Sequence, residues 1–331
     1  MICHDVEGLI SVLKTKRESA RELLFKVGID GGGGSLKVCL NAVAQPASTS
    51  GAQKKENTSG FLDSGVKKLI ILAIVPGASE SNENVGTILR ALNISSISFC
   101  LCSDLKLSNI CVGKQSHASK FPCTWCSATA PYESDAPLYT LGKIRRNVTA
   151  FRDAGMPLRK AQLYENCVQM PLLEGPDSAL VLDLIPPPEL HLMLGVVNKI
   201  FDSLNEEWGE DRAYQWGAKN YIIRTSYRGG SMEGNQCRQL LVKLGLLEKA
   251  LPSHLQAYAK ALKDFDQVRR SCFGQTLYED YDQAIRDFKD SFTELNIPVT
   301  PKLHALFVHV RQFCSRIKWN YDNKLFEQLR F

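Results

Sequence analysis

Four side chains of the zinc-binding type stand at ligand-like spacing in this 331-residue chain. Cys123 and Cys126 form a C-x-x-C pair, and His304 and His309 follow five positions apart. Thiolates and imidazoles at such spacings hold Zn²⁺ in a tetrahedron. A buried pair of small thiols or a thioredoxin-like redox motif would also explain the cysteines, and ordinary helix positions would explain the histidines. The four together predict a Cys2His2 zinc site built from two distant segments.

Two aspartates stand where β-forming segments end. Asp30 follows the apolar residues 23–29, and Asp104 follows the run 94–102. In open α/β sheets, ligands bind at the carboxyl ends of strands, and carboxylate oxygens suit Mg²⁺ or Mn²⁺. An aspartate after a strand is also a common turn former or helix cap. Both interpretations, a metal pair and a local cap, therefore stay open for these two residues.

Composition indicates a globular chain without membrane spans. With 44% hydrophobic residues, the chain can bury a core for one large or two ordinary domains. Its eleven cysteines, without a secretion signal, predict reduced intracellular thiols rather than disulfides. No apolar window is long enough for a membrane span. The net charge of +5 suits a polyanionic partner but is weaker than the signature of a dedicated nucleic-acid module.

The first 126 residues read as alternating strands and helices. After an amphipathic helix in residues 5–24, we expect a hairpin and then a β-α-β segment. The expected elements are strands 23–30 and 35–40, a disordered loop at about 45–65, strand 67–75, helix 81–92 and strand 94–102. Four glycines at 31–34 join the first two strands, but no Lys-Ser/Thr and no helix follow, which excludes a phosphate-binding P-loop.

This order predicts an α/β fold with a ribonuclease H-like mixed sheet. Three antiparallel strands, a crossover helix and a parallel fourth strand would bring Asp30 and Asp104 side by side. From about residue 160 onward helical periodicity dominates, which predicts a large, mostly α-helical zinc-binding insert. The expected divisions are an N-terminal helical segment 1–22, a catalytic subdomain 23–126, a helical zinc-associated region 127–316 and a C-terminal tail 317–331.

The chain resembles the Transib transposases and the related catalytic subunit of the V(D)J recombinase. Asp104 precedes Cys123 by 19 residues, as the second catalytic aspartate of that family precedes its zinc C-x-x-C. Residues 232–241 look like the Met-Asn-Gly-Asn element of the family, and residues 268–272 look like the segment that leads to its zinc histidines. The glycine-flanked Asp30 is similar to its first catalytic aspartate. The resemblance spans residues 24–314 and depends on the order of these motifs, since each alone is common.

The resemblance implies a DDE recombinase core that cleaves DNA and transfers strands. In such a core, two aspartates and a glutamate hold two Mg²⁺ or Mn²⁺ ions. The implied catalytic residues are Asp30, Asp104 and Glu327, whereas the zinc is structural. The implied partners are DNA (transposon ends or recombination signals), a second copy in a homodimer and an accessory subunit. The implied location is the nucleus, without a membrane.

The chain departs from the family at both ends. No terminal-repeat-binding domain precedes residue 1, and residues 317–331 diverge from the Ser-Glu-x-x-Glu-like pattern of the family. Glu327 fits the earlier glutamate of that pattern, and Asp322 is an alternative third carboxylate. The sequence is thus expected to be a core truncated at both ends, and three function classes stay open. These are an active DDE endonuclease or transposase, a DNA-binding protein without cleavage, and a zinc-stabilised interaction protein.

Overall fold

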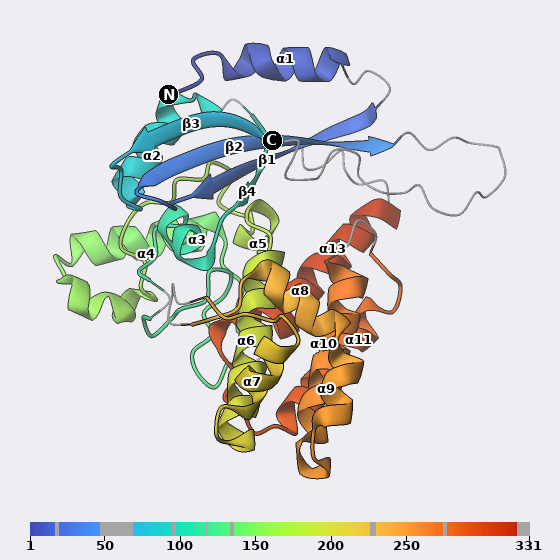
Figure 1. Ribbon diagram of the computed structural model, residues 1–331. Helices are drawn as coiled ribbons and strands as arrows, with labels where there is room; N and C mark the ends of the chain where they lie inside the picture. Colours follow the sequence, from blue (N-terminus) through green and yellow to red (C-terminus); the bar gives the residue numbers. More distant parts are fainter. Residues whose placement is uncertain are drawn as a thin grey trace. The chain divides into compact units, whose positions relative to one another are not determined.

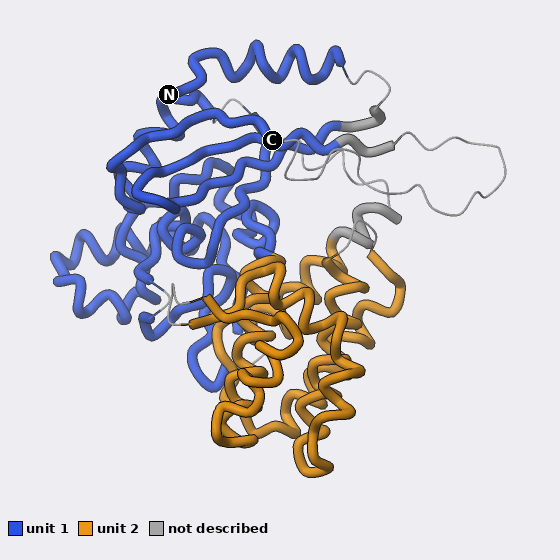
Figure 2. Tube along the Cα trace, in the orientation of Figure 1, with its two compact units in different colours: residues 1–188, 317–331 blue, residues 189–316 orange. Residues whose placement is uncertain are grey.

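The computed structural model divides the chain into two compact units (Figure 2). Unit 1 comprises residues 1–188 and 317–331, and unit 2 comprises residues 189–316. The structure describes residues 1–16, 20–46, 69–94, 97–116, 118–132, 136–225, 230–273 and 277–322. None of the helices in these ranges is both long and apolar enough to cross a membrane.

Unit 1 contains a four-stranded mixed sheet (Figure 1). Its strands are β1 (Ala20–Asp30), β2 (Ser35–Pro46), β3 (Ile70–Pro76) and β4 (Cys100–Cys102). They lie in the order β3-β2-β1-β4, with β1 antiparallel to β2, β2 antiparallel to β3, and β1 parallel to β4. This is the pairing that the sequence predicted. Its consequence is that β1 and β4 end at the same edge of the sheet.

The β1–β2 hairpin forms because hydrophobic residues alternate with polar ones along both strands. Phe25, Val27 and Ile29 of β1 are buried, while Lys26 and Asp30 are exposed. At the turn, Gly33 and Gly34 adopt φ values of 66° and 71°, a conformation that costs little only for glycine. The glycine run is therefore a turn, as the sequence indicated.

Six helical segments lie among the described residues before position 189. They are α1 (Val6–Lys16), α2 (Asn82–Ala91), α3 (Leu105–Cys111), α4 (Leu141–Asp153), the 3₁₀ segment η3 (Leu158–Tyr164) and α5 (Val181–Leu184). Helix α2 is the crossover between β3 and β4, and Ser81 caps it by accepting a hydrogen bond from the Asn84 N–H. The expected crossover helix is thus confirmed, and the structure adds Ser81 as its cap.

Three sequence-based boundaries were wrong or lie outside the described residues. The N-terminal helix ends at Lys16 instead of continuing to residue 24, because residues 20–24 belong to β1 and pair with β2. The fourth strand is three residues long, since only residues 100–102 meet a β1 partner. Gln45 and Pro46, which were expected in the disordered loop, end β2. The rest of that loop, from residue 47, lies outside the described residues.

Unit 2 is helical, as the periodicity predicted. Its helices are α6 (Glu189–Trp208), α7 (Arg212–Lys219), α8 (Gly234–Val242), α9 (Leu244–Ala250), η4 (Ser253–Leu255), α10 (Gln256–Cys272), α11 (Tyr281–Thr293), α12 (Pro301–His304), the π-helical η5 (Ala305–Val310) and the first part of α13 (Arg311–Asp322), up to residue 316. Its core includes an aromatic cluster in which Phe288 lies 5.3 Å from Phe265 and 5.5 Å from Phe307, measured between ring centroids. These contacts fix η5 against α10 and α11. The expected division at 126/127 falls inside unit 1, whereas the compact units divide at 188/189.

Candidate metal centre and carboxylate edge

Cys123 and Cys126 stand in a buried segment that follows α3. The backbone N–H of Trp125 donates a hydrogen bond to Cys123 Sγ, and that of Ala128 donates one to Cys126 Sγ, each at 3.4 Å. The indole of Trp125 is itself buried and donates to the Ile185 carbonyl at 2.7 Å. Each sulfur thus accepts an N–H from the residue two positions ahead. Such donors stabilise a thiolate, which is the form that binds metal.

His304 and His309 come onto one side of their helix because the helix is locally π-helical. In a regular α-helix, residues five positions apart point about 140° away from each other around the axis. Residues 305–310 are instead π-helical, and i→i+5 bonding places residue i+5 nearly above residue i. The two Nε2 atoms consequently lie 3.1 Å apart. The H-x4-H spacing, which is unfavourable on an α-helix, becomes ligand spacing on this one.

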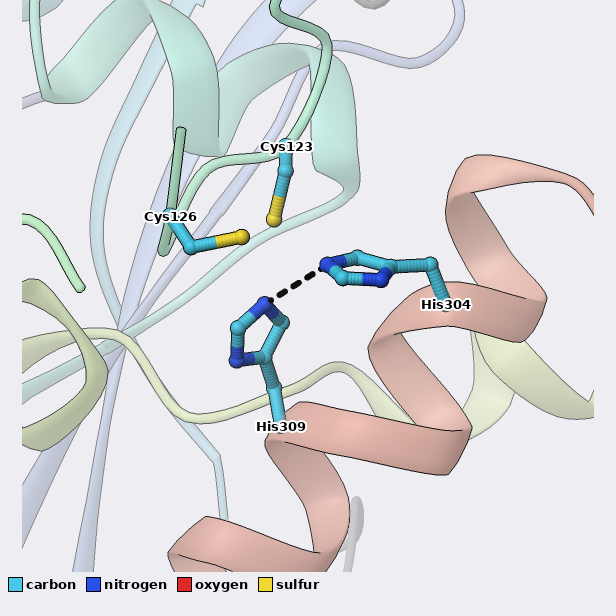
Figure 3. Close-up of side chains that lie close together, drawn as sticks. All are labelled: Cys123, Cys126, His304 and His309. Carbon is cyan, nitrogen blue, oxygen red and sulfur yellow. Dashed lines mark hydrogen bonds between the residues drawn. The ribbon is translucent and has the colours of Figure 1, made fainter. Parts of the chain in front are cut away.

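The four side chains form one cluster (Figure 3). One ligand atom from each of Cys123, Cys126, His304 and His309 lies within 4.8 Å of all the others, and the four residues are at most 3% exposed. In a tetrahedral zinc site, bonds of about 2.0–2.3 Å separate the ligand atoms by roughly 3.3–3.8 Å. The cluster therefore needs only small movements to hold a metal such as zinc.

An outer hydrogen bond prepares His309 as a ligand. Its Nδ1 lies 2.9 Å from the amide oxygen Oε1 of Gln312. That oxygen only accepts, so Nδ1 must carry the proton and the lone pair must lie on Nε2, which faces the other three ligands. Metal-binding histidines usually have such a partner on the second ring nitrogen, because it fixes the tautomer and the ring orientation.

A buried lysine accompanies the cysteines. The ammonium of Lys114 donates a 2.5 Å hydrogen bond to the Cys123 carbonyl and lies 4.1 Å from the centre of the Tyr139 ring. Burial lowers the pKa of Lys114, while nearby thiols and Glu165 oppose that shift. Burial raises the pKa of the Cys123 thiol, but the hydrogen bond with Cys126, the Lys114 charge and backbone N–H groups outweigh it, so the net shift is downward. The surroundings thus favour a thiolate at Cys123.

The carboxylate edge, defined here as Asp30, Asp104 and Glu80, lies at the end of the β1/β4 pair. The parallel register pairs Lys26 with Cys100 and Gly28 with Cys102. Asp30 and Asp104 each stand two residues beyond the last pair, so both follow the same end of this strand pair. The strand pairing thus brings together two segments that are 74 positions apart in the chain.

The two aspartates differ in their surroundings. The Asp30 side chain is 78% exposed, and its Oδ2 lies 4.0 Å from the Lys37 ammonium. Asp104 is half-buried and caps α3, with Oδ1 accepting the Leu107 N–H at 2.7 Å. Asp104 therefore caps a helix, which is one of the two roles that the sequence left open. Capping uses one carboxylate oxygen of Asp104 and does not prevent a metal from contacting the other.

Glu80 is a neighbour of this edge that sequence reasoning missed. Its carboxylate forms an ion pair with Lys106, two residues after Asp104. It also lies against Gly31, where an added Cβ would collide with the Glu80 side chain. The available signal was its position in the short turn between β3 and α2, since the turns that follow strands line ligand sites in α/β sheets.

The three carboxylates do not converge on one point. Among the described residues, the Cys/His cluster is the only set of three or more His, Cys, Asp or Glu with all ligand atoms close together. Glu327 and the side chain of Asp322 lie outside the described residues, so the predicted third carboxylate stays a prediction.

Comparison with models of known protein families gives no match, and no curated protein sequence matches the chain. What the fold and site define is a mixed α/β protein with a four-stranded sheet, many helices and a buried Cys2His2 cluster suited to a metal such as zinc.

Proposed function

We propose that the chain is a DDE-type transposase or recombinase core with a ribonuclease H-like sheet and a structural zinc site. The observation that carries this proposal is the parallel β1/β4 pairing, whose last pair, Gly28 with Cys102, lies two residues before Asp30 and two residues before Asp104. The strand order β3-β2-β1-β4, with α2 as the crossover, supports the same fold.

Asp30 and Asp104 are the proposed ligands for Mg²⁺ or Mn²⁺, because exposed carboxylate oxygens at a strand edge suit hard cations. Divalent ions held there supply charge neutralisation at a phosphodiester and activate the attacking hydroxyl. Glu80 already lies beside Gly31 and Lys106, and Glu327 is the third ligand proposed from the resemblance. Lys37 and Lys106 place ammonium groups at the same edge, where a DNA phosphate would enter.

The Cys/His cluster has the proposed role of a structural zinc site. Catalytic zinc sites keep a position open for water or substrate, whereas structural sites use four protein ligands. Here two cysteines and two histidines are all buried, which leaves no access for substrate. One zinc ion would close a chain segment of more than 170 residues, between Cys126 and His304, and so restrict its unfolded states.

A second candidate is a DNA-binding protein that does not cleave. It is favoured by the separation of the carboxylates and by the use of Asp104 as a helix cap. For either candidate we propose DNA as the partner, assembly as a homodimer with an accessory subunit, and a nuclear location. A zinc-stabilised interaction protein without a DNA role is the third class.

Nicking of supercoiled plasmid by the full zinc-loaded chain tests the proposal. We expect cleavage that requires Mg²⁺ or Mn²⁺ and falls on the order of 100-fold or more in Asp30→Asn. The matched control is Asp153→Asn, which removes an exposed aspartate at the end of α4. DNA binding is measured in parallel in Ca²⁺ over a range of salt concentrations. Binding without metal-dependent nicking would leave the second candidate, and the absence of both would leave the third.

A further inference from the structure

The α4–η3 segment, residues 141–164 and here named the basic hairpin, carries a concentration of positive charge. Six basic side chains and one acidic side chain fall within residues 141–160. The whole chain has 40 Lys and Arg against 35 Asp and Glu, so this one segment has as large a basic excess as the entire protein. Figure 1 shows α4 projecting beside α3. The rings of Phe151 in α4 and Tyr164 in η3 form a T-shaped pair with centroids 5.7 Å apart. This contact holds the two arms of the hairpin together.

Two of these basic groups are engaged in ion pairs within unit 1. Lys143 pairs with Glu165 at 2.9 Å, and Arg145 pairs with Asp177 at 2.6 Å. The other four are exposed and form no ion pair with any described residue. They are Arg146, Arg152, Arg159 and Lys160. Folding thus leaves four cationic groups available at the surface, of which Arg152, Arg159 and Lys160 lie close in sequence to the connection between α4 and η3.

The basic hairpin contacts the segment that follows α3, the helix that Asp104 caps. The Gln115 side chain donates a 3.1 Å hydrogen bond to the Leu158 carbonyl of η3, and Lys114 forms a β-bridge with Cys167. Gln115 follows closely after α3, whose seven residues span only about 10 Å from the Asp104 cap. The hairpin and the carboxylate edge therefore belong to one compact unit, within a distance that one DNA duplex can bridge.

We propose that the basic hairpin binds the phosphate backbone of DNA and holds it beside the carboxylate edge. This inference rests on the proposed function for its partner and adds the surface that holds it. Exposed arginines and lysines bind phosphates without reading sequence, and they release counterions when they do so. An anionic membrane fits less well, because the apolar residues of α4 are turned inward. Leu141, Ile144, Val148 and Phe151 are all buried, so α4 presents no apolar face to a bilayer, and the exposed apolar side chains of the other arm are two leucines, Leu158 and Leu163.

The test compares two variants with the same change in net charge. The hairpin variant replaces all four exposed groups by glutamine: Arg146→Gln, Arg152→Gln, Arg159→Gln and Lys160→Gln. The matched control replaces four exposed basic residues on helices of unit 2: Lys219→Gln, Arg238→Gln, Lys249→Gln and Lys289→Gln. Binding to a fluorescent DNA duplex is titrated in Ca²⁺ at several salt concentrations. Circular dichroism and zinc content establish that both variants fold like the parent.

We expect the hairpin variant to lose at least about tenfold in affinity near physiological salt. Its slope of log affinity against log salt should shrink by up to about 3.6, or about 0.9 for each lost phosphate contact. The control should change much less. Equal weakening in both variants would overturn the hairpin proposal while leaving parental nicking, and thus the proposed function, intact. Loss of binding to phosphatidylserine vesicles, with unchanged DNA binding, would also overturn it in favour of a membrane. A parent that neither binds nor nicks DNA would overturn both proposals.

Discussion

The Cys/His cluster and the carboxylate edge are the two candidate metal sites among the described residues. They differ in how far their ligand atoms are shielded from solvent. In the cluster, four ligands are buried and already lie within 4.8 Å of one another. At the edge, Asp30 is exposed, Asp104 is partly used as a cap, and Glu80 is paired with Lys106. The ligand atoms of one candidate site are enclosed, and those of the other face solvent.

This difference follows from what each site would do. A structural metal is held best by a complete ligand set in a water-excluded position. A metal that acts on a phosphodiester must stay accessible to it, and carboxylates brought together without cations repel each other. Under the proposed function, the carboxylates would have to move closer together when ions bind, whereas a protein that does not cleave DNA would leave them apart. Variants that affect one site and spare the other test this comparison.

The largest effect is expected from Cys123→Ser. Loss of one thiolate should abolish stoichiometric zinc and lower the free energy of unfolding by roughly 4 kcal/mol or more, because metal binding and folding are coupled. Metal analysis and denaturant unfolding measure both quantities. Cys237→Ser is the control, since this buried thiol donates to the Met232 carbonyl and a hydroxyl can replace it there. If the Cys123 variant keeps its zinc and its stability, the cluster is not a metal site.

A smaller and more selective effect is expected from paired substitutions at Asp104. Asparagine remains a good N-cap, so Asp104→Asn should keep stability near the parental value while removing a metal-binding carboxylate. Alanine removes both roles and should cost about 1 kcal/mol of stability in addition. Nicking rates and thermal unfolding separate the two roles. If Asp104→Asn nicks like the parent, Asp104 is a cap alone and the edge loses its second ligand.

The smallest effect is expected from Gln312→Leu, which removes the partner of His309 Nδ1 but leaves all four zinc ligands. Such outer contacts typically contribute about 10–100-fold in metal affinity. Competition with a chelator should show a lower zinc affinity, while the affinity of the carboxylate edge for divalent metals stays unaltered. Gln283→Leu, an exposed glutamine on α11 whose side chain also accepts and donates locally, is the control. Unchanged zinc affinity would show that Gln312 does not position His309.

Much of the fold and the zinc-type cluster could be predicted because the relevant signals are local. Alternation of apolar and polar residues defined β1 and β2, the glycines at 31–34 defined their turn, and Ser81 marked the start of α2. Ligand type and spacing singled out Cys123 and Cys126, and the two histidines with them. The strands, the turn and the C-x-x-C pair are encoded by neighbouring residues, whereas the pairing of the cysteines with the histidines joins segments far apart in the chain.

Only the tertiary structure decided the rest. Residues five positions apart do not lie on a common side of an α-helix. The π-helical turn at 305–310, which packs through Phe307, brings His304 and His309 together. The role of Asp104 as a cap and the position of Glu80 beside Gly31 likewise depend on where α3 and the β3–α2 turn lie in the folded unit. The sequence by itself determined which residues could bind metal, because that depends on side-chain chemistry. The fold determined which of them meet, because distances between residues far apart in the chain are set by packing and strand pairing.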